Sequence, residues 1–309
     1  MRRARRLRDD ASVATDVEEV WEHDIDVAAA RAWMLAHAVP GLDDVATRPD
    51  GATTVRRRVR TDSAPTWLEV EMPARGETVG LRGLGRGARE AIDIGRRWLG
   101  LDEDPSAGVL ALSADAELGP RVRARPGVRV PGSPDGLETA VGVVLGQHVS
   151  LGAARRFAGR LVAMYGQREG GGLLFPSAAR LARTDADRLR ARVGVTGARA
   201  RAVVALSRAV ADGLDLAPQP DPSRRVAVRA ELMAVPGIGA WTADLVALRC
   251  LRDPDVFLPG DLVLRRALGG VGAGEAARLA EPWRPHRSLA VVHLWTHHAL
   301  DPPPASERG

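Results

Sequence analysis

The sequence predicts a mostly α-helical protein with a small α+β domain at its N-terminal end. Strand-like alternation of apolar and polar residues is confined to the first hundred residues, and helical spacing continues from there towards the C-terminus. A Pro/Gly-rich stretch, Ala124–Gly136, punctuates the boundary between the two patterns. A chain of 309 residues with 45% hydrophobic and 27% charged residues is long enough for two or three domains with buried cores.

The N-terminal third is predicted to be a basic arm followed by the α+β domain. Residues 1–15 begin with a run of arginines, and we expect a mobile arm there. Residues 16–103 are expected to form the α+β domain. Its predicted elements are a helix near Ala28–Val39, strands at Thr54–Thr61 and Thr66–Met72, and a helix at Arg86–Leu99.

Residues 104–309 are predicted to be all-helical. The predicted helices are Leu137–Gln147, Leu151–Tyr165, Ser177–Leu181, Asp185–Arg192, Ala198–Ala211, Ser223–Met233, Trp241–Leu251, Leu262–Leu268, Glu275–Ala280 and Ser288–Leu300. Ser150, Ser177 and Asp185 stand at expected N-caps. We expect two subdomains, one at about 135–253 and one formed by about 104–134 together with 254–309.

Composition excludes several classes of function. Cys250 is the only cysteine, so the chain cannot build a disulfide framework, a multi-cysteine zinc site or a four-cysteine iron-sulfur cluster. We expect Cys250 to be a core thiol within a helix. The chain contains no lysine, which removes any mechanism that needs a lysine Schiff base. Because it shows neither a membrane-spanning apolar run nor the apolar stretch of a signal peptide, we expect a cytoplasmic protein.

Charge is distributed unevenly along the chain. The formal net charge is +5, but residues 119–210 carry eleven more arginines than acidic residues, whereas residues 13–118 carry eight more acidic residues than arginines. Such asymmetry is expected where one region of a protein binds a polyanion. Nucleic acid is therefore the leading partner, and arginines on solvated helix faces are the alternative.

The most specific motif is a short turn between two predicted helices, Val235–Gly239 (VPGIG). Pro236 ends the first helix, and we expect the two glycines to allow a turn too tight for a Cβ atom. Amides of the turn and of the next helix would point at one place outside the protein, where a DNA phosphate is the natural ligand. A structural αα-corner is the alternative. The predicted DNA-binding residues here are Gly237, Ile238, Gly239 and Ala240.

A carboxylate follows this hairpin after one further helix and loop, Asp261 in Leu258–Asp261 (LPGD). In isolation, an aspartate that opens a helix is usually an N-cap. The glycine hairpin followed by a Gly/Pro-rich loop and this aspartate resembles the helix-hairpin-helix DNA glycosylases, most of all the alkylated-base enzymes of the DNA-3-methyladenine glycosylase II type. The resemblance extends over Val130–Ser150, Phe175–Ala182, the hairpin, Asp255–Leu264 and Glu281–Trp295, and more weakly over the N-terminal domain.

The resemblance implies both a fold and a chemistry. The fold would be that of the helix-hairpin-helix DNA glycosylases, with the hairpin in one subdomain and the catalytic aspartate in the other. Asp261 would be the catalytic carboxylate, because cleavage of an N-glycosidic bond places positive charge on the deoxyribose. Trp241 stands where bifunctional relatives carry a Schiff-base lysine, so the enzyme would be monofunctional and without lysine-dependent lyase activity.

An aromatic base pocket is implied by the same resemblance. Trp241, Trp295 and Trp33 match positions that line the pocket, and electron-rich rings attract cationic methylated bases by stacking and cation–π interaction. For each tryptophan, packing in the protein core is the alternative. Leu245 occupies a pocket position that is often aromatic in the family, a departure that bears on base selectivity.

Two further interactions with DNA follow from the resemblance. Gln147 and His148 stand where relatives insert a side chain into the duplex to fill the space left by the flipped nucleotide. An exposed loop histidine is the alternative for His148. The hairpin of the family often holds a monovalent cation through backbone carbonyls, here those of Met233, Val235 and Ile238.

Other polar residues are expected to be structural. Asp244 is expected to form an ion pair or to lie on the surface, and Asp253 and Asp255 are expected in loop and capping roles. Adjacent residues of a helix point in different directions, so His297 and His298 are not expected to form a metal site.

The function that we predict is that of a monofunctional DNA glycosylase of base excision repair. It would flip an alkylated base such as 3-methyladenine out of duplex DNA and hydrolyse the glycosidic bond, leaving an abasic site. No cofactor is required, and the hairpin cation is an optional structural ion. Damaged double-stranded DNA is the expected partner of a monomer that associates with the nucleoid. The alternatives are a non-catalytic protein that binds damaged DNA and a glycosylase for deaminated or oxidised bases.

Overall fold

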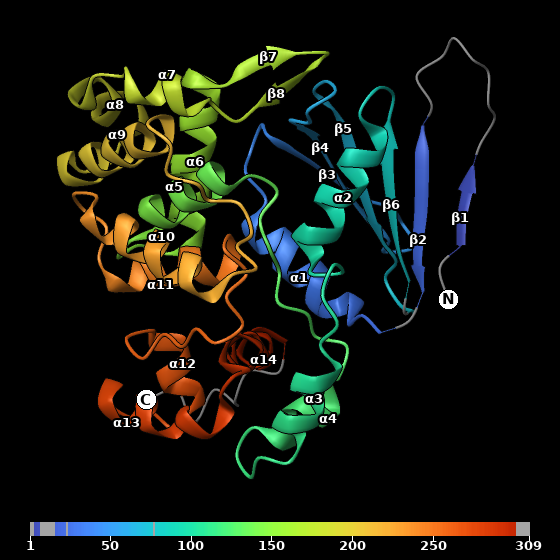
Figure 1. The fold of residues 1–309 in the computed structure, drawn as a ribbon. Helices are drawn as coiled ribbons and strands as arrows, with labels where there is room; N and C mark the ends of the chain where they lie inside the picture. Colours follow the sequence, from blue (N-terminus) through green and yellow to red (C-terminus); the bar gives the residue numbers. More distant parts are fainter. Residues whose placement is uncertain (1–2, 7–15, 23, 77, 301–309) are drawn as a thin grey trace.

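A six-stranded antiparallel sheet forms the N-terminal part of the molecule. The computed structural model describes residues 3–6, 16–22, 24–76 and 78–300. The strands are β1 (Arg3–Arg6), β2 (Val17–Glu22), β3 (Asp43–Thr47), β4 (Thr53–Val59), β5 (Thr66–Met72) and β6 (Thr78–Leu84). Their order across the sheet is β1-β2-β6-β5-β4-β3 (Figure 1).

The two predicted strands are present as β4 and β5, and part of the predicted basic arm, Arg3–Arg6, is also a strand, while the mobility of the arm stays a prediction. This segment is the edge strand β1, because its backbone pairs with residues Val17 to Val20 of β2. Pairing between distant segments has no local signal in the sequence. The rest of residues 1–15 lies outside the described residues.

The buried face of the sheet packs with α1 (Val27–His37) and α2 (Ala88–Leu99), the two helices predicted in this domain. Every second residue of β4 and β5 is buried, as expected for strands with one face on a core. Helix α2 packs closely against β6 because residue 83 of this strand is a glycine. A Cβ atom at Gly83 would lie 2.1 Å from the carbonyl oxygen of Ala88.

The second part of the chain is mostly helical, and all ten helices predicted there are present, with ends that differ by at most two residues. Ser150, Ser177 and Asp185 are confirmed as N-caps. Within the described residues, no helix is both long and apolar enough to cross a membrane. The elements are α3 (Ser106–Ser113), α4 (Gly119–Ala124), α5 (Gly136–Gly146), α6 (Leu151–Tyr165), α7 (Ala178–Ala182), α8 (Ala186–Val193), α9 (Gly197–Ala211), α10 (Pro222–Ala234), α11 (Ala240–Arg249), α12 (Leu262–Ala267), α13 (Ala273–Leu279), η1 (Glu281–Trp283) and α14 (Arg287–Leu300).

The prediction that residues 104–309 are all-helical is wrong at one place. Strands β7 (Gln167–Glu169) and β8 (Gly172–Leu174) form an antiparallel hairpin. Gly170 and Gly171 join them with φ values of +53° and +79°. Two successive positive φ angles match the twist of a tight hairpin, and glycine adopts them without steric cost.

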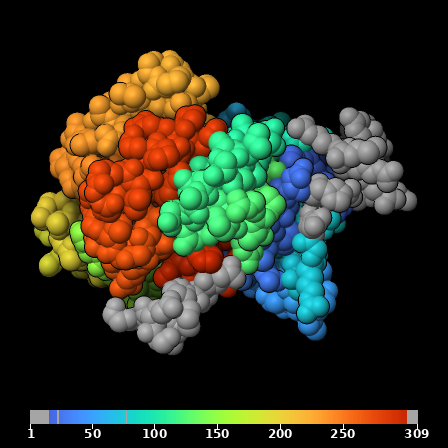
Figure 2. Space-filling view, turned by 90° about the horizontal axis from the view of Figure 1, so that it is seen from below, coloured from blue at the N-terminus to red at the C-terminus, as the bar shows by residue number. Residues whose placement is uncertain are grey.

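Helices α3 and α4 pack against the C-terminal helices, from which they are far apart in sequence. Arg121 of α4 donates from Nη2 to the carbonyl oxygen of Ala267, which ends α12, at 3.2 Å. Figure 2 shows this neighbourhood from below, with the green α3–α4 segment beside the orange-red C-terminal segment. The division of the helical region into two subdomains stays a prediction.

A buried ion cluster connects the sheet to the helical region. Arg57 occupies an inward-facing position of β4 and its side chain is 3% exposed. Its guanidinium donates to both carboxylate oxygens of Glu138 in the first turn of α5, and Nη1 lies 3.2 Å from Oδ1 of Asp43 in β3. Burial, together with the charge of Asp43, raises the pKa of Glu138 to about 7, and burial also raises the pKa of Asp43.

Replacement of Glu138 by glutamine is expected to flatten the pH dependence of stability. The pKa of Glu138 in the folded protein lies above its ordinary value of 4.5, so the folded protein holds a proton on this carboxyl group more tightly than the unfolded chain does. The contribution of this proton to the free energy of unfolding is complete below pH 4.5 and is lost as pH rises through 7. The change amounts to at most about 3 kcal/mol. Denaturant unfolding of wild type and Glu138→Gln across this pH range measures it.

The matched control is Glu231→Gln, which removes the partner of Arg224 in an exposed ion pair. This variant should retain the pH dependence of the wild type. If Glu138→Gln retained it as well, the pKa of Glu138 in the folded protein would have to equal its ordinary value.

Candidate nucleic-acid interface and base pocket

The predicted hairpin joins α10 to α11. Helix α10 ends at Ala234, and the turn is closed by a hydrogen bond from the amide of Ile238 to the carbonyl oxygen of Val235. Gly239 is the N-cap of α11, and no side chain caps the helix there. The first amides of α11 are therefore left available to an anion from outside the protein.

Only one of the two hairpin glycines is required by the packing of the protein itself. Gly237 has a φ of +89°, and a Cβ atom there would lie 2.6 Å from Cβ of Ala202 in α9. Gly239 has a φ of −94°, and a Cβ atom there would meet no atom within 4 Å. The expectation that both glycines serve the tightness of the turn is therefore wrong for Gly239, which borders open space.

The loop between α5 and α6 is attached to this hairpin. Nε2 of Gln147 donates to the carbonyl oxygen of Gly237 at 3.2 Å and to Oγ1 of Thr242 at 3.0 Å. Arg199 of α9 donates to the carbonyl oxygen of Gln147. His148 is exposed and has a φ of +54°, which is uncommon outside glycine. Gln147 thus holds the loop in place, while His148 presents its side chain to solvent.

Asp261 is the N-cap of α12, and it also contacts an aromatic ring. Its Oδ1 accepts a hydrogen bond from the amide of Leu264 at 3.0 Å, and Nε1 of Trp295 in α14 lies 3.4 Å from the same oxygen. Within the described part of the chain, Oδ2 has no protein donor and no arginine forms an ion pair with this carboxylate. The contacts of Oδ1 therefore fix the position of the carboxylate, while Oδ2 remains available to a ligand.

A row of three stacked rings leads away from Asp261. The ring centroids of Trp295 and Trp33 are 6.0 Å apart, and those of Trp33 and His37 are 3.9 Å apart. Nδ1 of His37 lies 2.8 Å from the carbonyl oxygen of Trp33, to which it donates. Burial and the nearby charge of Arg249 lower the pKa of His37 to about 3, so this imidazole is neutral. Two predicted pocket residues, Trp33 and Trp295, are thus brought together with Asp261.

Arg249, the last residue of α11, lies against the ring of Trp33. The guanidinium carbon is 4.7 Å from the ring centroid, and the residue is only 7% exposed. Burial lowers the pKa of Arg249 to about 10, so the side chain remains a cation at neutral pH. Nε donates to the carbonyl oxygens of Pro131 at 2.9 Å and Gly132 at 3.2 Å, and Nη2 donates to Gly132 at 2.8 Å.

Trp241 and Leu245 are partly buried against the main core and lie on the same helix as Arg249. Residues four apart share a helix face, so Trp241, Leu245 and Arg249 form one stripe along α11. The ring contacts of the described residues join Trp33 to His37 and Trp295 but do not include Trp241.

Arg249 and His37 are site residues that the sequence analysis missed. The available signal was spacing, because Arg249 continues the stripe of Trp241 and Leu245, and His37 follows Trp33 by four residues on α1.

The aspartates expected to be structural behave as such. Asp244 forms an ion pair with Arg229, with 2.5 Å between Oδ1 and Nε, which confirms the expectation for this residue. Asp253 accepts the amide of Asp255 at 2.9 Å, and Asp255 pairs with Arg287 at 2.8 Å.

Cys250 is 2% exposed, and burial raises its pKa to about 12, so it is the expected core thiol, although it is the C-cap that follows α11 and does not lie within the helix. Among the described residues, no group of three or more His, Cys, Asp and Glu side chains could hold a metal ion.

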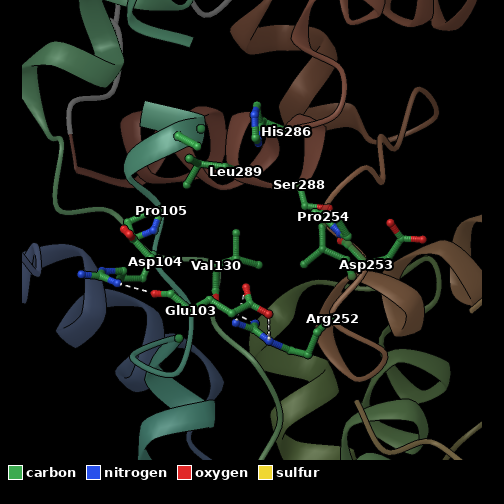
Figure 3. Close-up of a pocket in the computed structure, with 15 residues that line it drawn as sticks. Glu103, Asp104, Pro105, Val130, Arg252, Asp253, Pro254, His286, Ser288 and Leu289 are labelled. Carbon is green, nitrogen blue, oxygen red and sulfur yellow. Dashed lines mark hydrogen bonds and ion pairs between the residues drawn. The ribbon is translucent and has the colours of Figure 1, made fainter. Parts of the chain in front are cut away.

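A cavity of about 110 Å³ lies elsewhere, between α3, the loop after α11 and the start of α14 (Figure 3). Arg252 lines it and pairs with Glu103 at 2.9 Å and Asp102 at 3.4 Å, and it donates to the carbonyl oxygen of Val130 at 2.8 Å. Neither Asp261 nor any residue of the aromatic row lines this cavity. The candidate site is therefore the aromatic row beside Asp261.

Two family models match the chain. Residues 20–135 match the AlkA N-terminal domain, and residues 141–282 match the HhH-GPD superfamily of base excision DNA repair proteins.

Curated relatives carry similar sequences. A "Probable bifunctional transcriptional activator/DNA repair enzyme AlkA" of Mycobacterium tuberculosis is 42% identical over 225 residues, which are 69% of this chain and 44% of that protein. "DNA-3-methyladenine glycosylase 2" of Escherichia coli is 37% identical over 181 residues, which are 58% of this chain and 63% of that protein. The chain thus spans less than two thirds of the length of either relative.

A solved structure has the same fold. The 3-methyladenine DNA-glycosylase from Archaeoglobus fulgidus superposes with a TM-score of 0.72 at 18% identity, covering 90% of this chain and 97% of that one. This similarity confirms the predicted fold class.

The two hairpin glycines should respond differently to alanine. Gly237→Ala is expected to lower the free energy of unfolding by about 1–3 kcal/mol, because it combines a positive φ with a Cβ contact of 2.6 Å. Gly239→Ala should cost less than about 1 kcal/mol, the difference between two uncharged N-caps. Denaturant unfolding of both variants measures the difference, and equal losses would contradict this account of the turn.

Proposed function

Because the chain belongs to the HhH-GPD superfamily of base excision DNA repair proteins and carries an AlkA N-terminal domain, we propose that it is a DNA glycosylase of the DNA-3-methyladenine glycosylase II type. Its reaction would be the monofunctional hydrolysis of the bond between an alkylated base and deoxyribose in duplex DNA. The observation that carries this proposal is the contact of the Asp261 carboxylate with Trp295, which is stacked with Trp33.

Double-stranded DNA would bind across the hairpin and the loop after α5. The uncapped first amides of α11 supply donors for one phosphate, and the open space at Gly239 lets the DNA backbone approach them. His148 is exposed and follows Gln147, which bonds to the hairpin, and its side chain would fill the space left by the flipped nucleotide. One such face engages one duplex, so a monomer suffices.

The flipped base would occupy the space between the ring pair and α11. A flat base between two parallel rings needs about 7 Å, two van der Waals contacts, so it does not enter between Trp33 and Trp295, whose centroids are 6.0 Å apart. We assign the opposite wall to Trp241 and Leu245. Leucine at position 245 gives that wall an aliphatic surface where relatives often have a ring.

Asp261 would stabilise positive charge on the sugar as the glycosidic bond breaks. Two observations support this role. The carboxylate has no arginine partner among the described residues, so its charge is not neutralised in advance, and the hydrogen bond to the amide of Leu264 fixes its orientation. Water would complete the reaction at C1′, because the chain has no lysine to form a Schiff base.

The hairpin would also hold a monovalent cation. Its donors would be the carbonyl oxygens of Met233, Val235 and Ile238, at the end of α10 and in the turn. The donor chemistry fits, because hard cations prefer oxygen ligands and the carbonyl oxygen of Val235 has a second lone pair besides the one that accepts the amide of Ile238. Such a cation would add positive charge beside the bound phosphate. No other cofactor is required.

Asp261→Asn is expected to abolish most base release while leaving DNA binding intact. Asparagine caps helices as well as aspartate does, so α12 should keep its start, but the negative charge is lost. The single-turnover rate of 3-methyladenine release should fall at least about 100-fold. Release from methylated duplex DNA and the affinity for the same duplex are the measurements, with alkali treatment to separate base excision from strand cleavage.

The control is Asp244→Asn, which removes the partner of Arg229 away from the aromatic row and should leave base release unchanged. Full activity of Asp261→Asn would remove this carboxylate from the mechanism. Binding without release by the wild type, from any lesion tested, would favour a non-catalytic protein that binds damaged DNA.

The cation proposal predicts that DNA affinity depends on which monovalent ion is present. Replacement of sodium and potassium by tetramethylammonium at constant ionic strength should weaken binding to undamaged duplex several-fold, because that ion is too large for a site of main-chain carbonyls. Fluorescence anisotropy with a labelled duplex measures the affinity. An affinity that is independent of the ion would exclude a functional cation at the hairpin.

A further inference from the structure

Arg249 is a buried cation that forms no ion pair with any described residue. Three arginines are buried in the described part of the chain, Arg57, Arg249 and Arg252. Arg57 and Arg252 form ion pairs with carboxylates, whereas Arg249 donates only to main-chain carbonyl oxygens. A buried charge that is not paired is costly to retain. The retention of this buried cation therefore indicates a role beyond packing in the core.

The position of Arg249 relates it to the base pocket. It continues the stripe of Trp241 and Leu245, and Trp241 opens α11 beside the hairpin, so Arg249 lies at the end of the stripe farthest from the DNA-binding turn. Its guanidinium lies against Trp33, which is stacked with Trp295, and Trp295 contacts Asp261. A base that enters along the stripe would have the negative Asp261 on its sugar side and the positive Arg249 at its far end.

We propose that Arg249 is a rate- and specificity-determining residue that acts electrostatically on the departing base. The inference rests on the proposed function. When the bond between C1′ and the base nitrogen breaks, its electron pair leaves with the base, and a water oxygen then bonds to C1′. A cationic base leaves neutral and the proton of the water passes to solvent, whereas a neutral base leaves as an anion and takes up that proton. In both cases the charge of the base becomes more negative by one unit. The positive charge of Arg249 at the far end of the stripe favours this change.

The two classes of base differ in the bound state before cleavage. A neutral base such as hypoxanthine has no net charge for Arg249 to repel, so the cation would raise only its cleavage rate. A cationic base such as 7-methylguanine is repelled on binding, and this repulsion is relieved as the bond breaks. Arg249 would therefore weaken the binding of cationic bases and accelerate their release, and it would shift selectivity towards neutral bases.

Single-turnover base release by Arg249→Gln tests the proposal, with duplexes that contain hypoxanthine or 7-methylguanine. Glutamine removes the charge but retains an amide donor for the carbonyl oxygen of Gly132. For hypoxanthine, the maximal rate should fall and the half-saturating enzyme concentration should stay constant. For 7-methylguanine, the maximal rate and the half-saturating enzyme concentration should both fall. The ratio of the two efficiencies, 7-methylguanine over hypoxanthine, should rise about tenfold.

Arg252→Gln is the matched control. Arg252 is also buried and also donates to a main-chain carbonyl oxygen, that of Val130 next to Pro131, but it has carboxylate partners. This variant should change both substrates by the same factor. A uniform change in Arg249→Gln would overturn the proposal and leave Arg249 a structural role. No base release by the wild type from either duplex would instead overturn the proposed function, and this inference with it.

Arg249→Lys keeps the test decisive if the glutamine variant does not fold. A buried lysine has a lowered pKa, so its charge can be removed by raising the pH. The efficiency ratio should equal that of the wild type at low pH and rise as the lysine is deprotonated. The titratable and charged groups near this position are His37, Glu138, Cys250 and Arg252. All four are present in both proteins, so the pH profile of the wild type corrects for their titration. A ratio that follows the wild type at every pH would contradict the proposal.

Discussion

The ion cluster of Arg57 with Asp43 and Glu138 is the constraint on which the geometry of the site depends. The aromatic row crosses between two parts of the chain, because Trp33 belongs to α1 of the N-terminal domain and Trp295 belongs to α14. Buried charges that pair across the boundary cannot separate without a large cost in free energy. The sheet is thereby held against α5, and α1 keeps its place against α6 and α14.

The extended segment around Val130–Gly132 is a second connection between the two parts. Arg249 and Arg252 donate to its carbonyl oxygens from the helical side, and the amide of Gly132 donates to the carbonyl oxygen of Arg97 at the end of α2. A Cβ atom at Gly132 would lie 2.3 Å from that oxygen. Arginine suits such a position because its planar fork of donors can satisfy two carbonyl groups at once.

The groups around the aromatic row differ in charge for physical reasons. His37 is stacked closely on Trp33 and is held neutral by burial and by the charge of Arg249. Arg249 retains its proton despite the same burial, because a guanidinium starts from a much higher pKa. Among the residues that the structure describes, Asp261 has no arginine partner and its Oδ2 has no protein donor. The row of uncharged rings therefore contacts one negative group, Asp261 at Trp295, and one positive group, Arg249 at Trp33.

The sequence by itself determined the features that follow local rules. Helical spacing, N-caps such as Ser150 and Asp261, the VPGIG turn and the absence of lysine all depend on residues close together in the chain or on composition alone. Only the tertiary structure decided which distant groups meet. It paired β1 with β2, turned Arg57 inward against Glu138, placed Arg249 on Trp33, and showed that Gly237 and not Gly239 is confined by α9. An inward arginine or a required glycine depends on its partner across the fold, which no local pattern encodes.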